Sequence, residues 1–182
     1  MNVINILKYT KKFQRLANTF DCENQVINSF IRQDYAFDEN QGITYIMVDK
    51  NMSRIIGFYT IETSRIDEEE CIDSTKILKP MGGAIHINYF AMNKEFQKYK
   101  IGKINGRNIH LSDYLLTDCE NRILSIRNIV GASFITLSST EQGYNLYKRN
   151  SYENFEDDMY IAIKEKDLYG YKMYKCIDDI DL

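Results

Sequence analysis

The sequence predicts a mixed α/β (α+β) fold for one domain spanning residues 1–182. Three observations support this fold class. Residues 84–92 form a run rich in β-branched and aromatic side chains, which is the composition of a strand. Residues 101–127 place apolar side chains three or four positions apart, as an amphipathic helix does. Residues 43–48 and 54–61 are two further strands, joined as a hairpin.

Shorter patterns predict the remaining elements. Residues 1–19 indicate a short strand followed by a turn or helix, and a second helix over 21–31 takes Asp21 as its N-cap. The acidic stretch 64–83 is expected to be a long loop beside the acceptor substrate, or else a disordered insertion. A strand at 132–137 precedes a helix capped by Thr140, and the closing strands are expected at 159–164 and 169–174.

Composition excludes several classes of protein. With 182 residues, 44% hydrophobic and 27% charged, the chain can bury a sizeable core. Its four cysteines form no CxxC pair and its two histidines lie near no cysteine, so no metal site is expected. Because no signal peptide follows Met1 and no apolar run reaches membrane-spanning length, we expect a cytoplasmic protein with reduced thiols and no membrane partner.

The charge distribution is uneven. The formal net charge is −3, yet basic residues gather at 8–15 and at 94–107, and such patches can carry phosphate contacts on an acidic protein. A helix starting near Gly102 would direct unpaired amides and a positive dipole end toward that second cluster, which suits a phosphate. An ordinary strand–helix connection with a solvated basic face fits the same residues.

A resemblance decides between these interpretations. Residues 90–102, Phe-Ala-Met-Asn-Lys-Glu-Phe-Gln-Lys-Tyr-Lys-Ile-Gly, resemble motif A of the GNAT superfamily of acyl-CoA N-acetyltransferases, in which a strand is followed by Q/R-x-x-G-x-G/A. Gln97 and Gly102 match the first and last positions of that pattern, whereas Lys100 replaces its first glycine. The Lys100 side chain would either crowd a diphosphate or contact it with its ammonium group.

Two further segments resemble the same superfamily. Leu146-Tyr147, followed by Ser151-Tyr152, is similar to motif B, an apolar-Tyr pair before Gly-Phe. Residues 20–31 carry a Phe-x-Cys-x-x-x-x-Ile-Asn-x-Phe-Ile pattern similar to the opening of GNAT-type toxins from toxin–antitoxin pairs. Those enzymes acetylate the α-amine of aminoacyl-tRNA.

The resemblance implies a GNAT fold: a mixed, mostly antiparallel, twisted sheet splayed at its central strands, with helices on both faces. It implies acetyl-CoA as the co-substrate and Tyr147 as the general acid that protonates the departing thiolate, since a phenol has an ordinary pKa of about 10. The implied cofactor-binding residues are Phe90, Ala91, Met92, Gln97, Lys98, Tyr99, Lys100, Ile101, Gly102, Lys103 and Thr140.

The acceptor is not decided by these residues. Ile135 stands where some relatives carry a glutamate that acts as the general base. This departure favours either deprotonation of the amine through a water molecule or an amine of low pKa, such as that of aminoacyl-tRNA. That acceptor implies an antitoxin partner, and a homodimer is also expected. The acidic net charge favours a small amine or a protein N-terminus instead. If Lys100 blocks the diphosphate loop, the domain is an acyl-CoA-binding module without catalysis.

Overall fold

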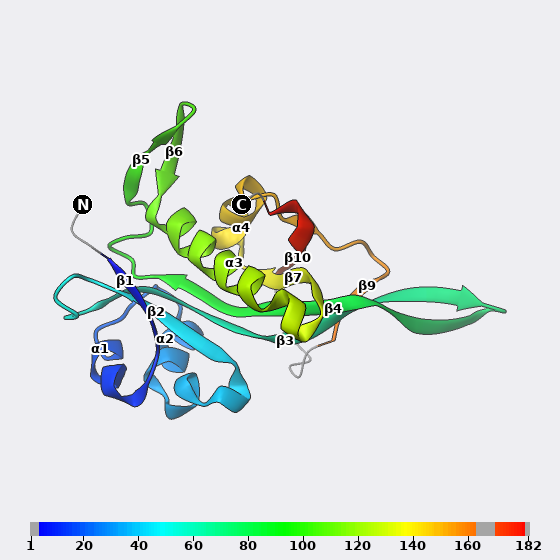
Figure 1. The fold of residues 1–182 in the computed structure, drawn as a ribbon, viewed down its shortest axis with the longest axis horizontal. Helices are drawn as coiled ribbons and strands as arrows, with labels where there is room; N and C mark the ends of the chain where they lie inside the picture. The colour runs from blue at the N-terminus through cyan, green and yellow to red at the C-terminus, as the bar shows by residue number, and fades with distance from the viewer. Residues whose placement is uncertain (1–3, 163–169, 181–182) are drawn as a thin grey trace. The chain divides into compact units, whose positions relative to one another are not determined.

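The computed structural model describes residues 4–162 and 170–180 (Figure 1). The predicted strands at 159–164 and 169–174 therefore lie partly outside the described residues. The principal elements are β1 (Asn5–Lys8), α1 (Gln14–Ala17), α2 (Gln25–Arg32), β2 (Ile43–Val48), β3 (Ile55–Ile72), β4 (Thr75–Met92), β5 (Lys100–Ile104), β6 (Arg107–His110), α3 (Leu111–Val130), β7 (Ala132–Ser139), α4 (Glu141–Arg149), β8 (Glu153–Asn154), β9 (Met159–Ile161) and β10 (Tyr171–Cys176).

The strands form a mixed sheet, which confirms the predicted α/β class. They pair in the order β1-β2-β3-β4-β7-β10-β8, with β9 on β3, while β5 and β6 form a separate hairpin. β4 and β7 run parallel, and β1–β2, β2–β3, β7–β10 and β8–β10 are antiparallel. The chain divides into two compact units, 1–62 with 88–119 and 63–87 with 120–182. The assignment of one domain to residues 1–182 stays a prediction.

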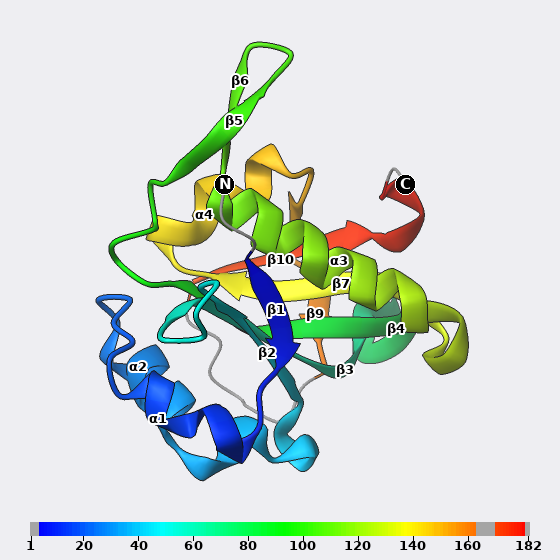
Figure 2. The same cartoon turned by 60° about the vertical axis from the view of Figure 1, so that its left-hand side comes forward.

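In the first unit, strand β3 is covered on both faces. Side chains alternate along a strand, so Phe58 lies on the face opposite to Gly57 and Tyr59. The Phe58 ring contacts Phe20 and Phe30, with centroids 5.3 and 6.1 Å apart. On the other face the Tyr59 hydroxyl donates to the Asp118 carboxylate of α3 at 2.6 Å. In Figure 2 the α1–α2 segment and α3 flank β2 and β3 accordingly.

The core of the first unit fills the side occupied by α1 and α2. The predicted start of the chain is confirmed, because β1 pairs with β2 from Asn5–Val48 to Lys8–Tyr45 and is followed by the short helix α1. Tyr9 is buried and its hydroxyl donates to the Ile31 carbonyl at 2.9 Å. The buried apolar cluster there consists of Tyr9, Leu16, Ala17, Phe20, Cys22, Phe30, Ile31, Ala36, Ile46, Val48, Ile55, Phe58 and Ala91.

The second unit contains the parallel strands. β4 and β7 pair from Ala84–Phe134 to Ile87–Leu137, which confirms the predicted strand at 132–137. Lys175 of β10 and Glu120 of α3 form a buried ion pair at 3.1 Å. The splay expected between β4 and β7 stays a prediction. No helix within the described ranges is long and apolar enough to cross a membrane.

The prediction of a loop or a disordered insertion over 64–83 is wrong, because strands β3 and β4 continue through these residues as a long two-stranded ribbon (Figure 1). Asp73 and Ser74 turn the chain with φ values of 49° and 65°, as a two-residue hairpin turn requires. The acidic residues lie on the ribbon, where Lys76 pairs with Glu69 and Lys79 with Glu70. Cross-strand charge pairs of this kind support a strand that composition alone assigns to a loop.

The helix predicted over 101–127 is wrong in its first ten residues. Residues 100–110 form the β5–β6 hairpin, and α3 begins at Leu111. Asn105 and Gly106 have φ values of 49° and 80°, which only a type I′ turn accommodates readily. The apolar residues at 101, 104 and 109 fit a helical spacing, but Asn-Gly is the stronger signal because it determines the local backbone.

We predict that Gly57→Ala destabilises the first unit. A Cβ at residue 57 would lie 2.7 Å from the Met92 sulfur, 2.9 Å from the Ala91 carbonyl oxygen and 3.0 Å from Leu115 Cδ2. Such overpacking costs about 1–3 kcal/mol. Urea unfolding measures this cost, with Gly102→Ala as the control because a Cβ there meets nothing within 4 Å. Equal midpoints for the two variants would contradict the prediction.

Candidate functional site

The chain after β4 is held by contacts to β3 and to the segment before α2. The Asn93 amide donates to the Ile56 carbonyl and the Lys94 amide to the Asp21 carbonyl, both at 2.8 Å. The Gln97 side chain donates to the Cys22 carbonyl at 3.3 Å. Residues 93–97 therefore have a defined path, although they belong to no helix or strand.

Asp21 is the centre of this attachment. Its carboxylate accepts hydrogen bonds from Lys94 Nζ, the Glu23 amide and Asn28 Nδ2, each at 2.9 Å. The hydrogen bond from Lys94, followed by those from the Glu23 amide and Asn28, holds the pKa of Asp21 well below its usual range. The carboxylate is thus charged throughout the physiological range and ties Lys94 to the start of α2.

The pattern over 20–31 has a structural explanation. Phe20, Phe30 and Ile31 are buried in the core of the first unit, and Asn28 is buried with its Oδ1 accepting from the Cys22 amide at 2.9 Å. The N-cap of α2 is Asn24, whose side chain accepts from the amides of residues 26 and 27. The prediction of Asp21 as the cap is wrong, because its carboxylate is directed to Lys94 and Asn28 instead.

Helix α3 starts at Leu111, ten residues later than the predicted start at residue 101. The Leu111 amide donates to the Tyr99 carbonyl at 2.9 Å, so the two ends of the hairpin meet. The His110 amide donates to the Asp113 carboxylate at 2.8 Å. Two amides at the start of α3 are thus occupied, and a carboxylate lies in its first turn. A diphosphate near this turn would therefore rely chiefly on side-chain cations.

The structure separates ten of the eleven predicted cofactor-binding residues into three groups, and the eleventh, Thr140, caps α4. Phe90, Ala91 and Met92 end β4, and Gln97, Lys98 and Tyr99 lie in the turn that follows. Lys100, Ile101, Gly102 and Lys103 belong to β5, where Lys103 faces Asn108 across the hairpin. Only the second group lies in the turn that directly follows β4. Cofactor binding by each of these residues stays a prediction.

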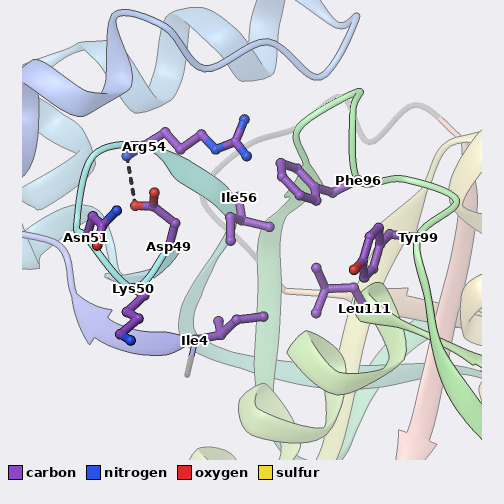
Figure 3. A pocket seen from close by; sticks show the side chains of 9 residues that line it. All are labelled: Ile4, Asp49, Lys50, Asn51, Arg54, Ile56, Phe96, Tyr99 and Leu111. Carbon is purple, nitrogen blue, oxygen red and sulfur yellow. Dashed lines mark hydrogen bonds between the residues drawn. The ribbon is translucent and has the colours of Figure 1, made fainter. Parts of the chain in front are cut away.

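A pocket of about 480 Å³ lies beside that turn (Figure 3). Its lining combines the β2–β3 turn, including Lys50 and Arg54, with Phe96, Tyr99 and the start of α3. The Arg54 guanidinium lies over the Phe96 ring, 4.8 Å from its centroid, and pairs with Glu95 at 2.8 Å. Sequence reasoning missed Arg54, because nothing in the sequence relates the β2–β3 turn to residues 95–99.

In the second unit, the end of α4 fixes the position of Tyr147. The Tyr152 amide donates to the Tyr147 carbonyl at 3.1 Å and the Ser151 amide to the Lys148 carbonyl at 3.3 Å, which is a Schellman motif. The rings of Tyr147 and Tyr152 meet edge to face at 5.4 Å, and both are buried. Main chain and ring of Tyr147 are therefore both constrained.

The start of α4 confirms the predicted cap. The Thr140 hydroxyl accepts from the Gly143 amide at 3.3 Å, and Glu141 lies in the first turn, where a negative charge favours the helix dipole. A Cβ at Gly143 would lie 3.0 Å from Ser139 Oγ and 3.6 Å from the Tyr147 ring. The first turn of α4 thus passes close to the Tyr147 side chain.

His86 is a buried histidine on the parallel strands. Its Nδ1 lies 3.0 Å from the Thr136 hydroxyl, and burial lowers the pKa of His86 to about 4. The ring is therefore neutral at pH 7. It contributes a hydrogen bond between β4 and β7 rather than a charge.

The comparisons with known proteins agree on the fold. No family model matches the chain. The chain is similar to the probable toxin TacT of Sinorhizobium fredii (strain NBRC 101917 / NGR234), with 29% identity over 93 residues, which cover 51% of the chain and 48% of the relative. The chain thus spans about half the length of this curated relative.

Solved structures match over nearly the whole chain. A crystal structure of AtaTR bound with acetyl-CoA gives a TM-score of 0.70 at 14% identity, covering 98% of this chain and 96% of that one. AtaT complexed with acetyl-methionyl-tRNAfMet gives 0.66 at 14% identity, covering 97% and 96%. A tyrosine-to-phenylalanine mutant of KacT gives 0.66 at 13% identity, covering 96% and 95%.

These matches confirm the predicted mixed α/β fold class: the chain has the same fold as the AtaT and KacT structures. Sequence identities of 13–14% establish the fold alone. The activity of this chain is therefore argued from its own residues together with the fold.

We predict that Ser151→Gly stabilises the second unit. Ser151 has a φ of 67°, the left-handed conformation that a side chain disfavours, and it occupies the position after the end of α4 where glycine is usual. The expected gain is about 0.5–1 kcal/mol in urea unfolding. Ser125→Gly, in the middle of α3, should instead lower stability. A loss of stability in both variants would contradict the prediction.

We predict that His86 makes the fold sensitive to mild acid. Its folded pKa of about 4 lies below the unfolded value near 6.5, so the unfolded chain binds the extra proton between these values. Stability is complete above pH 6.5 and falls by up to about 3 kcal/mol toward pH 4. Urea midpoints for wild type and His86→Gln across this range measure the difference. Parallel pH profiles for the two proteins would rule out this role.

Proposed function

We propose that this protein is an acetyl-CoA-dependent N-acetyltransferase that acetylates the α-amine of aminoacyl-tRNA, as the toxin of a toxin–antitoxin pair. The observation that carries the proposal is the fold match to AtaT and KacT over nearly the full chain. A structure of AtaTR contains acetyl-CoA and one of AtaT contains acetyl-methionyl-tRNAfMet. The motif residues of this chain support the same chemistry.

The donor contacts are assigned to the end of β4 and the turn after it. The main chain of Phe90, Ala91 and Met92 would hold the pantetheine arm and polarise the acetyl carbonyl. Gln97 to Lys103 would supply the diphosphate contacts, chiefly through lysine ammonium groups, since the first amides of α3 are occupied. Thr140 at the start of α4 is proposed to complete the cofactor set.

Tyr147 is assigned the proton transfer to the departing thiolate. When the amine attacks the thioester carbonyl, the carbon–sulfur bond breaks and the coenzyme leaves as a thiolate that needs a proton. The Schellman motif and the contact with Tyr152 hold the phenol in one orientation, as a general acid requires. The solved structures similar to this chain include tyrosine-to-phenylalanine mutants of AtaT and KacT, the substitution that would remove the phenol of Tyr147 here.

The acceptor assignment rests on two features. Ile135 is buried and apolar where a carboxylate base is found in some relatives, so the acceptor amine should be largely neutral by itself. The α-amine of an aminoacyl ester has a low enough pKa to meet this condition. We also propose a cytoplasmic location, where aminoacyl-tRNA occurs, an antitoxin partner and a homodimer.

We predict that Tyr147→Phe lowers kcat at least about 100-fold while leaving the Kd for acetyl-CoA unchanged, because general-acid catalysis contributes on the order of 10²–10⁴ in rate. Release of coenzyme thiol in the presence of aminoacyl-tRNA measures turnover, and calorimetry measures donor binding. Tyr144→Phe, on the same helix, is the matched control and should retain activity. Equal loss in both variants, or none in Tyr147→Phe, would refute the assignment.

A second acceptor class follows from the acidic ribbon. The acidic residues 67–70 lie on β3, where Glu69 and Glu70 pair with Lys76 and Lys79. The net charge of −3 would still attract a cationic amine or a protein N-terminus. A screen of amines beside aminoacyl-tRNA, read by the same thiol release, distinguishes the acceptors. Acetyl-CoA binding without turnover on any of them would leave an acyl-CoA-binding module.

A further inference from the structure

The β5–β6 hairpin contributes little to the core. All residues from Gly102 to Arg107 are exposed, and Ile104 exposes 63% of its surface. A Cβ added at Gly102 or Gly106 would meet nothing within 4 Å. A two-stranded hairpin is marginally stable by itself, so packing gives no reason for this sequence at the outer half of the hairpin.

The hairpin and the turn before it are basic. Residues 94–110 contain five lysines and arginines against one acid, in a chain whose net charge is −3. Lys94 is paired with Asp21, and Glu95 with Arg54. Further cations of this stretch lie at the base of the hairpin, Lys98 and Lys100, and near its tip, Lys103 and Arg107.

The spacing of these cations decides between two phosphate ligands. Lys100 pairs with His110 at the base of the hairpin, whereas Arg107 pairs with Ile104 beside the turn. At about 3.3 Å per residue, these two levels lie on the order of 13 Å apart. A single diphosphate is too compact to contact both levels. Phosphates repeated along a nucleic-acid backbone can contact both.

We propose that the outer half of the β5–β6 hairpin, through Lys103 and Arg107, binds the phosphate backbone of the RNA acceptor. The inference rests on the proposed function and refines it. Lys103 is assigned to the RNA acceptor instead of the donor diphosphate, whereas Lys98 and Lys100 remain assigned to the diphosphate. The hairpin directly follows the turn after β4, so it docks the RNA beside the proposed donor-binding segment. Its contacts are to phosphate and carry no base specificity.

The test compares tRNA binding by wild type and by Lys103→Gln/Arg107→Gln, measured by fluorescence anisotropy at several salt concentrations. Each lost phosphate contact lowers the slope of log K against log salt by roughly 0.7–0.9, so the double variant should lose about 1.5. Its affinity at low salt should fall on the order of ten-fold. The matched control is Lys76→Gln/Lys79→Gln, which removes two cations from the other exposed ribbon and should keep the slope.

A second variant removes the outer hairpin without touching its base. The Tyr99 carbonyl and the Leu111 amide already meet, so residues 101–109 can be replaced by Asn-Gly between Lys100 and His110. This shortened protein should show the same loss of slope as the double variant. Its unfolding midpoint is measured in parallel, so a folding defect is distinguished from a lost contact.

The outcomes separate the inference from the proposed function. Hairpin-dependent tRNA binding without acetyl transfer supports the inference and contradicts the proposed function. Acetyl transfer with an unchanged salt slope in both hairpin variants overturns the inference and leaves the function intact. If Lys103→Gln/Arg107→Gln lost acetyl-CoA affinity and bound tRNA normally, the inference would be overturned and Lys103 would be assigned to the donor diphosphate. Equal affinity of the wild type for tRNA and for a DNA duplex would overturn the assignment to RNA.

Discussion

The charged hydrogen-bond network of Asp21 is the interaction on which the candidate donor segment depends. The Asp21 carboxylate accepts from Lys94, the Glu23 amide and Asn28. The main-chain carbonyl of Asp21 accepts from the Lys94 amide. Residues 93–97 belong to no regular element, so their path is defined by these side chains rather than by a ladder of backbone bonds. The buried aromatic residues of segment 20–31 anchor the network to the core.

The same principle places Tyr147 in the second unit. A helix end is usually variable, but here two Schellman hydrogen bonds and an aromatic contact converge on one residue. Ser151 adopts a left-handed conformation to complete the motif, which a glycine would adopt at less cost. Motif B has glycine at the position of Ser151, and the left-handed backbone conformation there explains that preference. Ser151 adopts the same conformation, so both Schellman hydrogen bonds still form.

The hairpin between Tyr99 and Leu111 changes how the donor segment can work. In motif A the chain passes from strand to helix through glycines whose amides are available. Here the Tyr99 carbonyl accepts from the first amide of α3, and the Asp113 carboxylate accepts from the His110 amide just before the helix. Lysines provide positive charge in the preceding turn. A lysine ammonium is a point charge on a flexible side chain, so its contacts to an anion depend less on a fixed backbone geometry.

The sequence by itself determined the β2–β3 hairpin, the strands at 84–92 and 132–137, the Thr140 cap and the mixed α/β fold class. These depend on alternation, β-branched runs and capping residues, which act locally. Only the tertiary structure decided that 64–83 is a ribbon, that 100–110 is a hairpin and that Asp21 binds Lys94 instead of capping α2. The Asp21 contact depends on a partner 73 residues away. The ribbon and the hairpin depend on pairing between adjacent strands, and a short acidic or apolar run is compatible with several structures until that pairing forms.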